Sequence, residues 1–249
     1  MKDFNLCEGE SAEDLGIGGL YLIQNKDSFR FGTDAVVLAD FAKTIKSESI
    51  LDLCSGNGII PILLSHKTDA EKIVGLEIQE SVHKLAVRSV EMNGLCDRVE
   101  MVLGDLKNVR EYFPKRSFSL ITCNPPYMRF GGGIENMNES KYIARHEVLC
   151  NIDDVVFSAS QMLSDGGHLC MVHRPQRLCD VICAMRKYEI EPKRIRFVQA
   201  KPSSAPTLFL VDGLIKGGNE LIVMPPLVLY DEDGNPTAEY NRIYEREKN

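Results

Sequence analysis

The feature that most constrains the fold is an alternation of apolar runs with amphipathic stretches. Runs rich in aliphatic residues at 49–54, 72–78, 98–105, 118–124 and 168–174 alternate with helical spacing at 58–67, 80–93, 153–167 and 176–188. This order predicts an α/β fold with a mostly parallel sheet and helices on both faces. Two further runs, 193–200 and 206–215, predict a hairpin-like pair, which makes seven strands with one antiparallel. Such sheets bind ligands beyond the carboxyl ends of their strands.

Three regions are expected along the 249 residues. Residues 1–48 are interpreted as a hairpin, with strands 21–24 and 29–31, and a helix that Thr33 or Asp34 caps. Residues 49–230 form the α/β domain, whose helix 153–167 is expected to end at a Gly-Gly exit. Residues 231–249 form a polar, partly extended tail. No run of 18 apolar residues occurs, so no membrane span is expected.

The eight cysteines show no C-x-x-C pair and lie mostly in apolar runs. They are interpreted as free, buried thiols in a reducing cytoplasm, and no metal site is expected. The amino terminus lacks the basic-then-apolar pattern of a secretory signal. The net charge of −7 argues mildly against tight, nonspecific binding to nucleic acid.

Glycine or an acid follows each of the first three predicted strands. Gly56 and Gly58 precede a helix, where tight turning and free N–H groups suit an electron-rich ligand. Glu77 can accept from a ribose diol, and Asp105 can accept from an adenine amino group. Singly, the acids are equally well explained as a helix cap and a turn residue. Together, the three strand ends favour a nucleotide site.

The spacing around the first strand narrows the choice of nucleotide. A third glycine of a dinucleotide fingerprint and a Walker lysine are both missing, whereas Asp52 precedes Gly56 by four residues. The resulting D-x-x-x-G-x-G resembles the first motif of class I S-adenosylmethionine-dependent methyltransferases. That resemblance implies a Rossmann-like fold and S-adenosyl-L-methionine as the cofactor. It places Asp52 near the methionine amino group, the Gly56–Gly58 backbone along the cofactor, Glu77 at the ribose and Asp105 at the adenine.

The fourth predicted strand ends in Asn124-Pro125-Pro126-Tyr127. This tetrad resembles the motif of enzymes that methylate planar nitrogens: adenine N6, guanine N2 and glutamine amides. Such an amine attacks a methyl group only after it shifts toward a tetrahedral nitrogen. The Asn124 oxygen and the Pro125 carbonyl, held by consecutive prolines, can accept its two hydrogens. Tyr127 offers a face for base stacking. A proline-rich strand exit with a stabilising tyrosine is the structural alternative.

Several longer segments resemble one bacterial family. FRFGTDAVVLADFA, ARHEVLCNIDDVV, GGHLCMVHRPQRL and RKYEIEPKRIRFVQ, together with NPPY, resemble the tRNA1(Val) adenine-37 N6-methyltransferases over roughly 29–227. The resemblance implies methylation of the adenine beside the anticodon, with Thr33 and Asp34 near the methionine end of the cofactor. The alternatives are a release-factor glutamine methyltransferase, a guanine-N2 rRNA methyltransferase, a DNA adenine methyltransferase and a non-catalytic, cofactor-binding RNA scaffold.

A tRNA partner requires cationic contacts to phosphates. Residues 174–201 hold a basic cluster, and the glycine-rich 128–146 loop is interpreted as a lid that substrate orders. A solvated face is the plainer explanation of the cluster, and the oligomeric state is left open. The candidate RNA-binding residues are Arg129, Lys141, Arg145, Arg174, Arg177, Lys193, Arg194 and Arg196.

Overall fold

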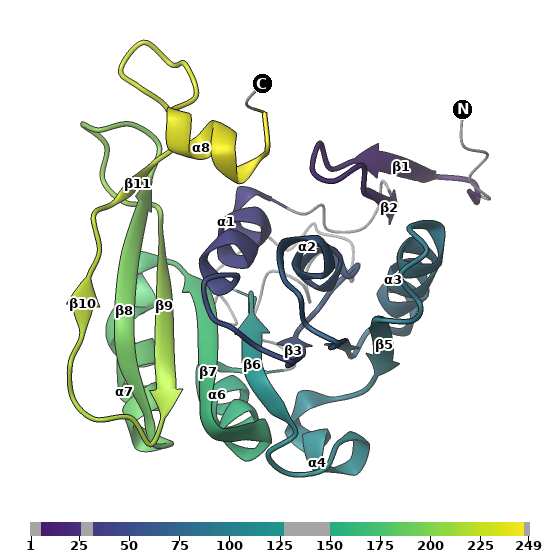
Figure 1. Ribbon diagram of the computed structural model, residues 1–249, viewed down its shortest axis with the longest axis horizontal. Coiled ribbons are helices and arrows are strands. Elements are labelled where there is room, and N and C mark those ends of the chain that lie inside the picture. The colour runs from purple at the N-terminus through teal and green to yellow at the C-terminus, as the bar shows by residue number, and fades with distance from the viewer. Residues whose placement is uncertain (1–5, 26–31, 127–149, 247–249) are drawn as a thin grey trace, which may run out of the picture.

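A twisted, nine-stranded sheet forms the centre of the computed structural model, which describes residues 6–25, 32–126 and 150–246 (Figure 1). The strand order is β10-β8-β9-β7-β6-β3-β4-β5, with β11 paired to β8. The strands are β3 (Ser49–Leu53), β4 (Lys72–Glu77), β5 (Val99–Leu103), β6 (Phe118–Cys123), β7 (Leu163–His173), β8 (Ile190–Gln199), β9 (Leu208–Ile215), β10 (Ile222–Val223) and β11 (Leu227–Val228).

Strand directions confirm the predicted sheet. The β5-β4-β3-β6-β7 pairs are all parallel, and β9 is antiparallel to both β7 and β8. The seven predicted strands are present, with β9 as the single reversed one. Two short strands, β10 and β11, extend the edge parallel to β8. They were not predicted, because two residues are too few to show a period.

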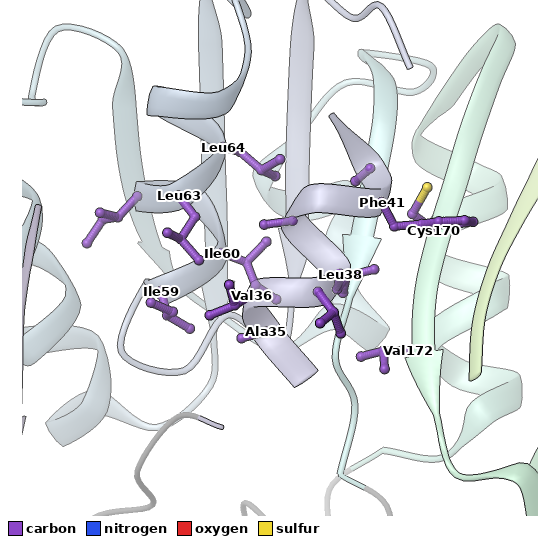
Figure 2. Packing of buried hydrophobic residues seen from close by; sticks show 14 of the residues in the cluster. Ala35, Val36, Leu38, Phe41, Ile59, Ile60, Leu63, Leu64, Cys170 and Val172 are labelled. Carbon is purple, nitrogen blue, oxygen red and sulfur yellow. The ribbon is translucent and has the colours of Figure 1, made fainter. Parts of the chain in front are cut away.

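Helices cover both faces of the sheet. One face carries α1 (Thr33–Ala42), α2 (Ile59–Lys67) and α3 (Glu80–Met92), and the other carries α4 (Val109–Tyr112), α6 (Ile152–Met162) and α7 (Leu178–Lys187). Figure 2 shows the first core, where α1 and α2 pack together and Leu38 and Phe41 approach Cys170 and Val172 of β7. Leu169 and Met171, which alternate with those β7 residues, belong to the second core. Alternation along a strand that is buried on both faces therefore supplies both layers.

The amino-terminal hairpin differs from the prediction. Strand β1 (Glu10–Asp14) pairs antiparallel with β2 (Tyr21–Asn25), and the backbone N–H of Ile23 donates to Ser89 Oγ of α3 at 3.0 Å. The second strand expected at 29–31 lies outside the described residues. Helix α1 begins after Gly32, which is the N-cap residue, so the capping role predicted for Thr33 or Asp34 is wrong.

Two other boundaries also differ from the prediction. Gly166 and Gly167 lie inside β7 and do not form a helix exit, because β7 begins directly after α6 and bulges where its register with β6 shifts. The carboxyl-terminal region, expected to be extended, contains α8 (Ala238–Ile243), which buries Tyr240 and Ile243. Two buried apolar residues, three positions apart in an otherwise polar segment, are too short a pattern to predict a helix.

No helix in the three described ranges is both long enough and apolar enough to cross a bilayer.

Candidate active site

Several of the residues predicted to bind the cofactor lie near the point where the strand order reverses. Strand β3 lies between β4 and β6, and its neighbours connect in opposite directions along the chain. Register places Asp52 of β3 level with Gly75 of β4 and Thr122 of β6. A crevice for a ligand is expected at such a switch point, beyond the carboxyl ends of these strands.

The two glycines after β3 serve different purposes. Both have left-handed backbones, with φ of 57° at Gly56 and 83° at Gly58. A Cβ added to Gly56 would meet no atom within 4 Å, so a ligand can approach that stretch of backbone closely. A Cβ added to Gly58 would lie 3.3 Å from Ala86 Cβ. Gly58 therefore allows α2 and α3 to pack, whereas Gly56 opens the turn toward the crevice.

Glu77 is tied to the glycine turn. Its side chain is buried at the end of β4, Oε2 accepts from the Gly56 N–H at 2.8 Å, and Oε1 accepts from the Gln79 N–H at 2.8 Å. Burial raises the pKa of Glu77, although the backbone hydrogen bonds oppose the shift. The structure thus brings together two residues that the sequence connected only by spacing. Glu77 orients the turn whether or not it also contacts a ribose.

Asp52 is completely buried beside this turn. Its Oδ1 accepts from Thr122 Oγ1 at 2.6 Å. The Ser55 hydroxyl lies near enough to the carboxyl to lower its pKa, but neither Asp52 Oδ2 nor Ser55 Oγ reaches hydrogen-bond geometry with a group in the described part of the chain. Burial raises the pKa of Asp52 to about 7. Orphaned polar atoms of this kind suit a ligand that brings its own polar groups. Thr122 was missed by the sequence reasoning, and its only signal was a hydroxyl within the apolar run LITC.

Asp105 has a local structural role. It is the N-cap residue of η1 (Leu106–Asn108), its Oδ1 accepts from the Lys107 N–H at 2.9 Å, and Lys107 Nζ lies 3.7 Å from Oδ2. Tyr112 lies beside it, because the Asp105 N–H donates to the tyrosine hydroxyl at 3.4 Å. The predicted adenine contact therefore involves a carboxylate that already caps a turn. Two lone pairs per oxygen leave room for both roles.

The tetrad begins where β6 ends. Asn124 is half-buried and Pro125 is buried, and β6 register carries them alongside the turn that follows Leu53. Thr33 is half-buried and Asp34 is buried in the first turn of α1. Four predicted residues lie outside the described residues: Tyr127, Arg129, Lys141 and Arg145.

The described candidate RNA-binding residues are divided between the carboxyl end of β7 and strand β8. Arg174 and Arg177 lie at the carboxyl end of β7, the second of them in η2 (Pro175–Arg177), where Arg177 Nε donates to Asp180 at 2.7 Å. Arg194 and Arg196 lie on β8. Arg194 Nε donates to the buried Asp212 at 2.8 Å.

The other β8 cations also have protein partners. Arg196 makes a two-pronged ion pair with Glu239 of α8, at 2.9 and 2.8 Å, and Lys193 Nζ donates to the Gly218 carbonyl at 3.0 Å. Reversing the charge of Arg194 or Arg196 would leave a partly buried acid facing a second acid. Such variants would lower the stability of the fold, so a loss of RNA binding could not be assigned to a lost phosphate contact.

A known family matches this arrangement. The family model of the methyltransferase small domain matches residues 25–188, which span every site element from α1 to α7. The chain belongs to this family. The methyltransferase is similar to the tRNA1(Val) (adenine(37)-N6)-methyltransferase of Flavobacterium johnsoniae, at 29% identity over 73% of this chain and 76% of the relative. A protein of the same name from Porphyromonas gingivalis is 25% identical over 88% of each chain.

Solved structures agree on the fold. A predicted O-methyltransferase from Agrobacterium tumefaciens superimposes with a TM-score of 0.67 at 19% identity, covering 85% of this chain and 95% of its own. The M. jannaschii tRNA m1G37 methyltransferase gives 0.60 at 15% identity, covering 84% and 58%. At these identities the likeness concerns the fold alone, and it confirms the Rossmann-like class I methyltransferase architecture.

The methyltransferase uses S-adenosyl-L-methionine, as its family implies. The residues present fit that group on two observations. The open space beside Gly56 admits a ligand against the backbone, and the unpartnered Asp52 Oδ2 and Ser55 Oγ suit its polar end. The buried Asp52 carboxyl also suits a cofactor that carries positive charge on its sulfonium and amino groups, because a nearby cation favours the ionised form of a group whose pKa burial has raised.

The raised pKa of Asp52 makes a testable prediction about ligand-free stability. Because the folded state holds this proton up to about pH 7, whereas the unfolded chain releases it near pH 3.8, stability should fall as pH rises through that window. Each pH unit costs about 1.4 kcal/mol of unfolding free energy. Denaturant unfolding between pH 5 and 7 should show this slope in the wild type and lose it in Asp52→Asn.

Thr122→Val provides the second variant for that experiment. Removing the hydrogen bond that favours the carboxylate should raise the folded-state pKa further and extend the upper limit of the window to higher pH. Identical pH profiles for all three proteins would show that Asp52 is ionised at neutral pH despite its burial.

Proposed function

We propose that this methyltransferase transfers a methyl group to N6 of an adenine in tRNA, at position 37 of tRNA1(Val). The observation that carries the proposal is the position of Asn124-Pro125. Register of β6 with β3 sets this dipeptide beside the Cys54–Gly58 turn, one strand away from Asp52. An amide oxygen and a carbonyl oxygen would therefore lie next to the proposed cofactor site, where the methyl acceptor must approach.

The chain's own residues prepare the amine. S-adenosyl-L-methionine supplies a methyl group already activated on a sulfonium sulfur. The Asn124 oxygen and the Pro125 carbonyl accept hydrogen bonds from the two amine hydrogens, which favours a tetrahedral nitrogen and stabilises its developing positive charge. Pro126 limits the backbone freedom of Pro125, so the carbonyl keeps its direction. Tyr127 is proposed to stack on the base.

The remaining site residues are proposed to hold the cofactor. Asp52 would face its amino group, the Gly56 backbone would line it, Glu77 would accept from its ribose and Asp105 from its adenine. Gly58 would act through the packing that shapes the turn. Thr33 and Asp34, at the amino end of α1, are proposed to contact its methionine end. Holding cofactor and amine in line is the main catalytic task, because no covalent enzyme intermediate is needed.

The tRNA acceptor is supported by the names of the relatives and by resemblance over most of the chain. Arg174 and Arg177 are the described cations best placed for phosphate contacts, because β7 is the neighbour of β6 and both residues follow its carboxyl end. Lys193, Arg194 and Arg196 are weaker candidates, because they lie on β8, which is two strands farther from β6 than β7 is. A tRNA substrate would place the enzyme in the cytoplasm.

A parallel transfer assay tests the acceptor. Labelled cofactor would be supplied with total tRNA, total rRNA and a release factor in separate reactions, followed by nucleoside or amino-acid analysis. We expect labelled N6-methyladenosine in the tRNA reaction alone. With purified tRNA1(Val) as the substrate, the label should appear at position 37. Label on glutamine of the release factor, or on guanine of rRNA, would overturn the proposal in favour of that alternative. If the enzyme methylates none of the three substrates, the proposal that it methylates an adenine in tRNA would be wrong.

A further inference from the structure

Three cysteines meet between the cofactor turn and the acceptor motif. Cys54 follows β3, Cys123 is the last residue of β6, and Cys150 precedes Asn151, the N-cap residue of α6. The Sγ atoms of Cys54 and Cys150 lie 3.8 Å apart, and the Cys54 thiol is also hydrogen bonded with that of Cys123. Residues 96 positions apart in the chain thus bring two thiols into direct contact.

The cluster is placed to affect both functional segments. Cys54 has φ of 57°, a left-handed backbone that non-glycine residues rarely adopt, and it leads directly into the turn that presents Gly56. The next residue, Ser55, anchors this turn, because its N–H donates to the Leu76 carbonyl at 3.0 Å. Cys123 immediately precedes Asn124. A covalent change at Cys54 would therefore lie within two residues of Gly56 in the cofactor turn.

Metal binding does not account for the cluster. In the described part of the chain, no three His, Cys, Asp or Glu side chains are arranged to hold a metal ion. As whole residues, Cys54 and Cys150 are partly exposed, whereas Cys123 is buried. The thiol groups of Cys54 and Cys150 are themselves mostly enclosed, so only a small solute such as a peroxide would reach them. Two thiols in contact, without a metal-ligand arrangement, favour sulfur–sulfur chemistry.

We propose that Cys54 and Cys150 form a site of reversible modification, at which a peroxide oxidises the two thiols to a disulfide that weakens cofactor binding. The inference does not depend on which acceptor is methylated, because its readouts are the cross-link and the affinity for S-adenosyl-L-methionine. The cross-link would close the present 3.8 Å separation to about 2 Å, and this pulls Cys54 away from Cys123 and distorts the start of the Gly56 turn.

The oxidation balances with hydrogen peroxide as the oxidant. The thiolate of one cysteine attacks a peroxide oxygen, the O–O bond breaks, and the departing hydroxide leaves as water, which yields a sulfenic acid. The second thiol then attacks that sulfur, the S–S bond forms, the S–O bond breaks, and the proton of the second thiol completes another water. Two thiols lose two electrons in total, and one peroxide becomes two waters. A dithiol reductant reverses the cross-link.

The protonation state of the cluster sets the rate. The hydrogen bond with Cys123 raises the pKa of Cys54, so the thiolate is a minor species at neutral pH. Cross-linking should therefore be slow at pH 7 and accelerate about tenfold for each pH unit toward pH 9. The exposed cysteines, which lie elsewhere on the surface, provide an internal comparison: Cys7, Cys96, Cys179 and Cys183.

Peptide mapping and calorimetry of the whole protein test the site. After treatment with hydrogen peroxide, mass spectrometry without reduction should find Cys54 joined to Cys150. The affinity for S-adenosyl-L-methionine should fall by about tenfold or more, and dithiothreitol should restore it. Cys150→Ser should keep the untreated affinity and become insensitive to peroxide. Cys179→Ser is the matched control and should remain sensitive.

Two results would overturn the proposal. One is the absence of a Cys54–Cys150 peptide in oxidised protein that has lost affinity. The other is an equal loss of affinity in Cys150→Ser, because oxidation of other residues would then explain the effect. If Cys150→Ser does not fold, Cys150→Ala serves the same comparison, and the peptide map of the wild type decides independently.

Discussion

Replacing Asn124 with alanine should lower methyl transfer by about 10²–10³-fold or more, while the affinity for S-adenosyl-L-methionine stays within about threefold. Alanine removes one of the two acceptors that favour a tetrahedral amine. The variant therefore stabilises the transition state less, because positive charge develops on the amine nitrogen there. Asp52, Gly56 and Glu77 should remain in place, because Thr122 donates to Asp52, and Glu77 accepts from the backbone N–H groups of Gly56 and Gln79. Single-turnover transfer from labelled cofactor measures the first quantity, and calorimetry measures the second.

Two further variants make the Asn124 result interpretable. Asn124→Asp keeps an acceptor oxygen at the same position, so it should retain more transfer than Asn124→Ala. Asn108→Ala changes an exposed asparagine near the end of β5 and should behave as the wild type. Turnover near the wild-type value in Asn124→Ala would remove this residue from the mechanism, and a large loss of cofactor affinity would assign it to binding.

Replacing Glu77 with alanine should weaken binding of S-adenosyl-L-methionine by about 10–100-fold, an effect of about 1.4–2.8 kcal/mol. The variant removes the proposed acceptor for the ribose. It also removes the 2.8 Å bond that holds the Gly56 N–H, so the turn itself loses support. Calorimetric titration of the folded variant measures the change, and circular dichroism checks that the fold is retained.

Two controls separate these contributions of Glu77. Glu77→Gln keeps an oxygen for one backbone N–H but cannot offer oxygens to both Gly56 and Gln79, so we expect an intermediate affinity. Glu80→Ala, three residues later, removes an exposed acid that pairs with Lys84 and should leave binding unchanged. An affinity unchanged in Glu77→Ala would exclude both the ribose contact and the need for the link to Gly56.

Local periodicity was sufficient to predict most of the fold. The strands ending at Leu53, Glu77, Leu103 and Cys123 were each marked by an apolar run with a breaker after it. The errors fall where the signal is short or ambiguous. Two-residue edge strands have no period, α8 has only two buried residues, and Gly166-Gly167 reads as a helix exit although it forms a bulge within β7.

The strand-end rule also located the candidate site, because the ends of parallel strands must meet at one edge of the sheet. Gly56, Glu77 and Asn124 could therefore be placed near one another without a structure. Their mutual contacts could not. Spacing along the chain does not predict which oxygen of Glu77 accepts from the Gly56 N–H. It also does not predict that Gly56 and Gly58 have different surroundings.

The sequence by itself determined the order of strands and helices, the glycine turn and the chemical type of the Asn124-Pro125 motif. Each of these depends on a few residues that are neighbours in the chain. Only the tertiary structure decided the side-chain partners. Thr122 reaches Asp52 across 70 residues, and Cys54 meets Cys150 across 96. Strand register and layer packing set these contacts, and burial at those positions then sets the pKa of Asp52.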